Sequence, residues 1–257
     1  MYSLIVRLQI AAATFEINLA MGYLLGSRTR ERCIVLYSTP LLYHAPMACS
    51  LAARIAAAEA EVELELAYVD LATKQLSDGS SFLTVSPLGQ VSVLRLPDGQ
   101  LLSETSTVLV WLQSNATRAD RRMAAGSDDF FQMHRWISFC ATELHKQLFR
   151  VLFYPEATQE VKERIRALAP ERFAVLDRHL TGRAFLVGQD FSAADAYLIW
   201  ALQLMNRAQL DPSVHPALWD YQQRLSVRPK VHAMIASDEI KSDEIKSDLQ
   251  RKTTNKV

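Results

Sequence analysis

One cysteine, Cys49, stands where the sequence predicts that a helix begins. An apolar run typical of a β-strand ends at Pro46, and residues 48–60 are rich in Ala, Leu, Arg and Glu without Gly or Pro, so a helix should start near Ala48. The unpaired N–H groups and positive dipole end of a helix favour an anion, which lowers the pKa of a thiol placed there. Cys49 is therefore a candidate nucleophile. The alternative is a structural role, in which Cys49 is a small apolar side chain buried in the core.

The other cysteines, Cys33 and Cys140, add neither a disulfide framework nor a metal site. The chain has 3 cysteines, an odd number without a pairing pattern, which favours a reducing compartment such as the cytoplasm. No C-x-x-C spacing is present, so we expect no zinc and no metal cofactor, and a thioredoxin-type protein with a resolving cysteine is disfavoured.

The charge balance argues against two kinds of partner. Lys plus Arg and Asp plus Glu both number 28, so the net charge of the 257 residues is zero, and we expect neither nucleic acid nor a membrane as partner. Residues 8–25 are fairly apolar, but Gln9, Glu16 and Asn18 interrupt them, which makes a poor transmembrane span. We expect residues 1–33 to be an extension outside the fold.

Residues 34–115 are predicted to form a small α/β domain of order β-α-β-α-β-β-α. Apolar and polar side chains alternate from Val62 to Tyr68 as in a half-buried strand, and Pro97-Asp98-Gly99 is a turn signal between two strands. Ser103 is placed to cap the helix that follows. The expected elements are strands at 41–44, 62–68, 91–96 and 101–102, a helical turn at 82–85, and helices from about 48 and over 104–113.

Residues 122–236 are predicted to form an all-helical domain, because no convincing strand follows Arg121. Ser192 and Asp195 have the spacing of a capping box, so Asp195 is assigned to folding rather than catalysis. The expected helices are 126–153, ended by Pro155, 158–180, with Gly182 past its end, a run to about Ala208, and shorter helices punctuated by Pro212, Pro216 and Pro229.

Residues 237–246 consist of two consecutive copies of the unit Ser-Asp-Glu-Ile-Lys. A five-residue period is too short for a solenoid repeat, and the composition is highly charged. We therefore predict that residues 237–257 are a solvated tail, either frayed helix or disordered, that carries no chemistry.

Taken together, several stretches resemble the cytosolic glutathione transferases, most closely the bacterial cysteine-bearing (Beta-class) branch. The resemblance runs from about Leu41 to Ile235 and implies a thioredoxin-like domain followed by an all-helical domain, the order that periodicity predicts. The stretches that carry it are the cysteine turn 42–51, the strand and basic loop 69–74, the segment 86–94 that is similar to the family's N-P-x-G-x-V-P-x-L, the glutamate turn 102–105, the helix segments 136–139 and 143–146, and the capping motif 191–195.

The resemblance implies that glutathione, γ-Glu-Cys-Gly, binds the first domain as a co-substrate. Glu104 would pair with the γ-glutamyl ammonium, and the helix-start N–H and the hydroxyl of Thr105 would receive its carboxylate. The backbone of Val91 would pair with the cysteinyl amide. Lys74 and Gln90 would reach the other polar groups of the peptide.

The glutathione sulfur would face Cys49 in this arrangement. His145 and Lys146 would flank it, with Ser138 and Thr142 one turn back on the same helix. Positive groups near a thiol stabilise the thiolate, which is the reactive form. Taken singly, such side chains are more often solvated or structural, so the prediction depends on their joint placement.

Two positions depart from the family pattern. Ser92 stands where the family has a cis-proline. A cis peptide bond before a residue other than proline costs about 2.5–4 kcal/mol. We therefore expect either a trans bond or a strained cis bond before Ser92, and in both cases weaker binding of the cysteinyl group of glutathione. Ser138 replaces an asparagine and offers fewer donors.

Two functions of different classes remain. The first is an enzyme that conjugates glutathione to a small-molecule electrophile, or that catalyses glutathione-dependent thiol–disulfide exchange through a Cys49–glutathione mixed disulfide. The second is a non-catalytic module of the same fold that binds a ligand or a protein. Cys49, Glu104 and His145 favour the first and Ser92 the second.

The resemblance also implies a homodimer that buries the faces around residues 104–145. Leu148, Leu152, Phe153 and Met205 are candidates for the electrophile pocket and equally for the core.

Overall fold

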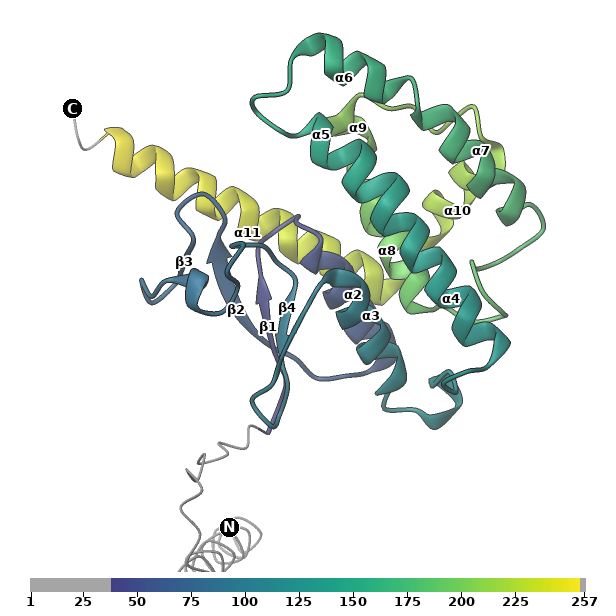
Figure 1. Cartoon of the computed structure of the whole chain (residues 1–257), viewed down its shortest axis with the longest axis horizontal. Coiled ribbons are helices and arrows are strands. Elements are labelled where there is room, and N and C mark those ends of the chain that lie inside the picture. The colour runs from purple at the N-terminus through teal and green to yellow at the C-terminus, as the bar shows by residue number, and fades with distance from the viewer. Residues whose placement is uncertain (1–37, 255–257) are drawn as a thin grey trace, which may run out of the picture. The chain divides into compact units, whose positions relative to one another are not determined.

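The computed structural model describes residues 38–254, and every structural statement below concerns this part of the chain. The predicted extension, residues 1–33, lies outside it. A sheet-containing part is followed by an all-helical part, as the sequence predicts (Figure 1). No helix within residues 38–254 is both long enough and apolar enough to cross a bilayer.

The first part is built on a mixed sheet of five strands in the order β3-β2-β1-β4-β5. The central strand β1 pairs in parallel with β2 and antiparallel with β4, and helix α2 makes the crossover that a parallel pair requires. The elements are β1 (Leu41–His44), α2 (Ser50–Ala60), β2 (Glu65–Asp70), β3 (Gln75–Leu76), the short 3-10 helix η1 (Phe82–Thr84), β4 (Val93–Arg95), β5 (Leu101–Ser103) and α3 (Thr105–Ser114).

Two boundaries in this part differ from the predictions, and each has a local cause. Strand β2 begins at Glu65 rather than at Val62, because Glu61 takes a left-handed conformation and the N–H groups of Glu61 and Val62 still bond to the end of α2. The prediction that Ser103 caps α3 is wrong. Ser103 is the last residue of β5, and Glu104, with a positive φ of 68°, is the capping position.

The two faces of the sheet carry separate apolar clusters, because side chains alternate along a strand. Leu42 and Leu94 pair across β1 and β4 and join the main core with α2 and α3, which lie between the sheet and the helical part (Figure 1). Tyr43 and Val93 point the other way and pack with Phe82 in a small second cluster. The main core is thus continuous from β1 into the helices.

The second part contains the long helix that the sequence predicts over 126–153. It consists of α4 (Asp128–Phe139), the π-helical segment η3 (Cys140–Phe149) and α5 (Arg150–Leu152). The predicted helix 158–180 is in fact two helices, because Pro170 has no N–H and starts a new helix instead of continuing one. The remaining helices are α6 (Gln159–Arg166), α7 (Ala169–Leu180), α8 (Ala193–Gln203), α9 (Met205–Ala208), α10 (Pro216–Ser226) and α11 (Pro229–Thr254).

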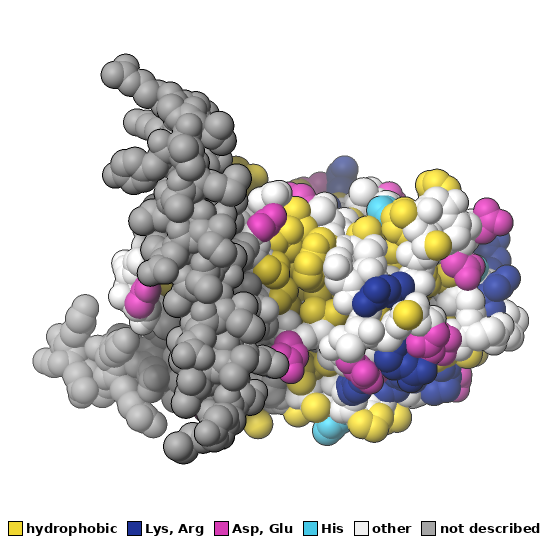
Figure 2. Space-filling model, turned by 90° about the horizontal axis from the view of Figure 1, so that it is seen from below, with side chains coloured by type: hydrophobic (Ala, Val, Ile, Leu, Met, Phe, Trp, Pro, Cys, Tyr) yellow, Lys and Arg dark blue, Asp and Glu magenta, His cyan; other side chains and the backbone are white. Residues whose placement is uncertain are grey.

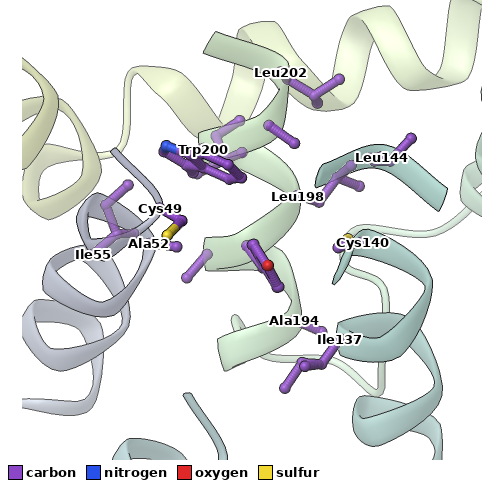
Figure 3. Packing of buried hydrophobic residues seen from close by; sticks show 14 of the residues in the cluster. Cys49, Ala52, Ile55, Ile137, Cys140, Leu144, Ala194, Leu198, Trp200 and Leu202 are labelled. Atoms are coloured by element: carbon purple, nitrogen blue, oxygen red, sulfur yellow. The ribbon is translucent and has the colours of Figure 1, made fainter. Parts of the chain in front are cut away.

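Helix α8 is the centre of the core, and every residue from Ala193 to Leu202 is buried. The predicted capping box is present at its start: Asp195 accepts hydrogen bonds from the backbone N–H and the hydroxyl of Ser192, and also from Leu186 N–H and the Tyr221 hydroxyl. These four donors compensate a fully buried carboxylate, which supports the assignment of Asp195 to folding. Figure 3 shows Cys49 and Cys140 on opposite sides of α8.

The surface mixes charges of both signs. On the face that Figure 2 shows, basic and acidic side chains are interspersed with apolar ones. Several pairs are exposed, such as Arg164 with Glu160 at 2.9 Å. Exposed pairs of this kind contribute roughly 0–1 kcal/mol each, so the stability of the fold depends on buried contacts.

The C-terminal helix corrects the prediction of a tail from residue 237. Helix α11 runs on from Pro229 to Thr254 without a break at that point, and it passes alongside the sheet and α2 (Figure 1). Asp238, in the first copy of the five-residue repeat, is completely buried. The repeat resembles a solvated segment because most of its side chains are charged, but the carboxylate of Asp238 is buried and contacts the rest of the fold.

The Asp238 carboxylate accepts hydrogen bonds from three groups of the first part. His44 Nε2 lies 3.1 Å away, the Met47 backbone N–H lies 2.8 Å away, and the Arg54 guanidinium forms an ion pair with the same carboxylate. The other nitrogen of His44 lies 2.8 Å from the hydroxyl of Ser50. One side chain of α11 therefore joins the end of β1, the turn after it and helix α2.

We predict that Asp238→Ala lowers the free energy of unfolding by about 3–5 kcal/mol, because His44 and Arg54 lose the partner of a buried charge. Urea denaturation of the full chain measures this. Glu239→Ala is the matched control, since this neighbouring side chain is exposed and its loss should change stability by less than about 0.5 kcal/mol. Equal, small effects of both variants would contradict the role assigned to Asp238.

Candidate functional site

The turn between β1 and α2 holds Cys49 in place from several sides. Met47 adopts a positive φ of 61°, and its N–H donates to Asp238 while its carbonyl accepts from Trp200 Nε1 at 3.2 Å. The Ser50 hydroxyl accepts from Ala45 N–H at 3.2 Å. Helix α2 begins at Ser50 with Cys49 as its capping residue, two positions after the predicted start near Ala48. The cysteine turn, residues 45–50, is therefore a fixed element.

The Cys49 thiol is nearly buried, with 7% of the residue exposed. It donates a hydrogen bond to the Val91 carbonyl at 3.1 Å. Burial raises the pKa of Cys49 above its usual value, although the hydroxyls of Thr105 and Ser92 and the charge of Lys146 act in the opposite direction. The prediction of a lowered pKa is thus wrong, because loss of water outweighs the favourable groups at the helix start.

The segment before β4 faces the cysteine turn. The Val91–Ser92 peptide is cis, which is the second of the two alternatives that the sequence left open. Ser92 is buried, and its hydroxyl lies 3.2 Å from the hydroxyl of Thr105. Lys74 approaches the same segment from the β2–β3 connection and donates to the Gly89 carbonyl at 3.0 Å. Gly89 has a φ of 59°, and a Cβ there would meet the Lys74 side chain at 2.7 Å.

Two hollows lie beside these elements. The larger, of about 500 Å³, lies between the cysteine turn and the helices η3, α5, α8 and α9. The smaller, of about 180 Å³, lies at the start of α3. The two share Leu88, Gln90, Val91, His145 and Lys146 as lining residues.

The structure brings most of the predicted site residues to these hollows. Cys49 and Lys74 line the larger one, and Glu104 and Thr105 line the smaller one. Gln90, Val91, His145 and Lys146 line both. Residues separated by nearly a hundred positions in the chain therefore meet where the resemblance implies a single site.

Ser138 and Thr142 are the exceptions, since both are exposed and line neither hollow. The Thr142 hydroxyl donates to the Ser138 carbonyl at 3.0 Å instead. The π-helical segment η3 begins between them, at Cys140. A π-helix has a wider turn than an α-helix, so residues counted back at α-helical spacing from His145 no longer share its face.

His145 does not supply the positive charge that the sequence predicts beside the sulfur. Burial, followed by the nearby charges of Lys146 and Arg150, lowers the pKa of His145 to about 4. Its Nδ1 forms a 2.8 Å hydrogen bond with the Tyr197 hydroxyl, and its ring packs edge-on against Trp200. At neutral pH the imidazole is therefore uncharged, and Lys146 is the cation whose charge acts on Cys49.

Several lining residues escaped the sequence prediction, among them two aromatic and two basic ones. Tyr197 and Trp200 lie three residues apart on α8 and line the smaller and the larger hollow, respectively. The available signal was this spacing of two aromatic side chains with polar atoms, which places them on one helix face. Arg150 and Arg207 also line the larger hollow, but they come from separate helices and no local pattern joins them.

The electrophile candidates divide between core and hollow. Phe153 lines the larger hollow, whereas Leu148, Leu152 and Met205 are buried in the core. Within the described residues, no group of three or more His, Cys, Asp or Glu side chains is placed to hold a metal ion.

Comparison with known proteins gives a consistent result. The family model for the glutathione S-transferase N-terminal domain matches residues 46–115, and the model for the C-terminal domain matches residues 142–238. Glutathione S-transferase GstA of Escherichia coli O157:H7 is 32% identical over 202 residues, which are 78% of this chain and 99% of that protein.

Solved structures of bacterial enzymes share the fold at similar identity. A sphingomonad glutathione S-transferase complexed with glutathione is 34% identical, with a TM-score of 0.73 over 77% of this chain and 98% of that one. A beta class glutathione S-transferase of Sphingomonas chungbukensis is 32% identical, with a TM-score of 0.72 over 77% of this chain and 98% of that one.

We predict that an alkylating reagent labels Cys49 before Cys140 at neutral pH, and that Lys146→Met slows the labelling of Cys49 by about two- to fivefold. Cys140 is fully buried and its pKa is raised by burial and by Asp195, whereas Cys49 has one nearby cation. Mass spectrometry of timed samples measures both rates. Labelling of Cys140 first, or no effect of Lys146→Met, would contradict the assigned environments.

Proposed function

Since the chain belongs to the glutathione S-transferase family, we propose that it conjugates glutathione to an electrophile in the hollows beside Cys49. The observation that carries the proposal is the convergence of Cys49, Val91, Glu104 with Thr105, and Lys146 on hollows that share a wall. Glutathione bound to the sphingomonad relative supports it. The two described cysteines are unpaired, which fits a cytoplasmic location.

The proposed binding mode follows the polar groups available. The γ-glutamyl end occupies the smaller hollow, where Glu104 meets its ammonium and the start of α3 at Thr105 meets its carboxylate. The Val91 carbonyl accepts from Cys49 and has a second lone pair for the cysteinyl N–H. Lys74 and Lys146 provide positive charge for the glycyl carboxylate.

The proposed chemistry acts on the sulfur of glutathione. Its thiol loses a proton to solvent, the thiolate forms a carbon–sulfur bond with the electrophile, and the leaving group departs with the electron pair. The charge of Lys146 stabilises the thiolate. Neutral His145 adds no charge, and Cys49 stays a thiol that can donate a hydrogen bond.

Thiol–disulfide exchange is the second candidate, because Cys49 itself lines the larger hollow. In that reaction the Cys49 thiolate attacks a disulfide sulfur and releases the other half as a thiolate. Glutathione thiolate then attacks the mixed disulfide and restores Cys49. The raised pKa of Cys49 leaves little thiolate at neutral pH, so we place conjugation first.

We predict that Cys49→Ala keeps the rate of conjugation (kcat/KM) within about fivefold and abolishes glutathione-dependent disulfide reduction, because only exchange requires a covalent bond to Cys49. Parallel assays with 4-chloro-3,5-dinitrobenzamide and hydroxyethyl disulfide measure the two activities.

The control for this experiment is glutathione binding, measured by titration calorimetry. Glu104→Gln should weaken glutathione binding by roughly tenfold, since it removes the charge opposite the γ-glutamyl ammonium. A protein that folds but binds no glutathione would refute the proposed function and leave the non-catalytic module. Loss of both activities in Cys49→Ala would assign Cys49 a role in conjugation.

We propose further that the protein is a homodimer through the predicted faces around residues 104–145. Phe131 on α4 lies within this range and is 60% exposed, and Leu101, three residues before the range, is 45% exposed; both are available for a contact with a second copy of the chain.

Light scattering at micromolar concentration should give twice the chain mass of 29.0 kDa. Phe131→Glu should shift the equilibrium towards the monomer, because it places a charge in an apolar contact. Val227→Glu, at an equally exposed position after α10, should leave the mass unchanged. A monomeric wild type would refute the proposed dimer.

A further inference from the structure

The larger hollow carries charge of one sign only. Four basic side chains line it, and no Asp or Glu is among its lining residues, although acidic and basic residues are equal in number in the chain. The basic residues are Lys74, Lys146, Arg150 and Arg207. A cleft of one sign attracts ligands of the opposite sign and raises their local concentration.

Glutathione accounts for only part of this charge. Lys74 and Lys146 flank the Val91 segment and are the cations assigned to glutathione above. Arg150 on α5 and Arg207 on α9 lie on the side formed by the helical part. Neither forms an ion pair with a carboxylate of the described chain, so their charge is not neutralised within it.

Both guanidinium groups lie over aromatic rings, which do not neutralise their charge. Arg207 lies 4.9 Å from the centre of the Phe153 ring, and Arg150 lies 5.4 Å from that of Tyr154. A cation over a ring keeps its outer N–H donors available. Both arginines are exposed at the rim of the hollow.

The wall between these arginines and Cys49 is apolar and largely aromatic. Phe149 and Phe153 stack with their ring planes 10° apart, and Trp200 meets Phe149 edge-on. All three rings line the hollow; Phe153 is half-buried, and Phe149 and Trp200 reach the wall from the core, with 1% and 3% of each residue exposed. Flat side chains of this kind favour a flat, apolar ligand body, and an aromatic pair contributes specific geometry beyond the buried area.

We propose that the electrophile is an aromatic anion: its ring packs on Phe149, Phe153 and Trp200, and its carboxylate, sulfonate or phosphate group pairs with Arg150 and Arg207. The inference rests on the proposed conjugation and adds the substrate class. A carboxylate at these arginines could belong instead to the glycyl end of glutathione, and the experiment separates the two sources.

The test compares two electrophiles that share a reactive carbon and differ in charge, 4-chloro-3,5-dinitrobenzoate and 4-chloro-3,5-dinitrobenzamide. In both, the glutathione thiolate displaces chloride, so each rate is divided by the uncatalysed rate. At low salt we expect kcat/KM to be at least fivefold higher for the benzoate, and this ratio to fall towards one in 1 M NaCl.

The double variant Arg150→Gln, Arg207→Gln should bring the ratio close to one through a higher KM for the benzoate, with the KM for glutathione within twofold of wild type. Arg164→Gln is the matched control, because this exposed arginine pairs with Glu160 and lies outside the hollow; its ratio should equal that of wild type.

Three results would overturn the inference. Turnover of both compounds at equal relative rates would refute the anionic preference and leave the proposed function intact. A higher KM for glutathione in the double variant, with an unchanged ratio, would assign the arginines to glutathione itself. No turnover of either compound, together with no binding of glutathione, would refute the proposed function and this inference with it.

Discussion

The buried carboxylate of Asp238 is the constraint on which the rest of the site depends. A charge without water must be compensated by donors, and its donors are His44, the Met47 N–H and Arg54. These groups come from the end of β1, the cysteine turn and α2, whereas the carboxylate comes from the last helix. The last helix is therefore one of the elements that hold the cysteine turn, together with Ser50 of α2 and Trp200 of α8.

This way of fixing the turn has a chemical consequence. Packing that immobilises Cys49 also removes water from its thiol and raises its pKa, and the same burial keeps His145 neutral. Among the described residues, Lys146 supplies the charge that favours a thiolate there, and its side chain is exposed. In the proposed binding mode the reacting sulfur belongs to glutathione, which enters from solvent, and the buried Cys49 thiol is not required to ionise.

Local patterns predicted what local interactions determine, and long-range contacts explain the failures. Strand β1, the capping box at Asp195 and the long helix of α4, η3 and α5 each follow from adjacent residues. Asp238 does not, because its partner His44 lies 194 positions away and its neighbours in sequence look solvated. The same holds for the pKa of Cys49, which depends on burial by residues distant in sequence. The displacement of Ser138 and Thr142 follows from a π-helical turn that helical periodicity does not reveal.

The two parts of the fold contribute different groups to the site, and one side chain connects them. The sheet part offers mainly backbone atoms and small polar side chains, at Val91, Glu104 and Thr105. The helical part offers aromatic rings and arginines. Trp200 belongs to both environments: its ring lines the larger hollow, and its Nε1 donates to the Met47 carbonyl in the cysteine turn. One hydrogen bond thus joins the helical wall of the larger hollow to the turn that positions Cys49.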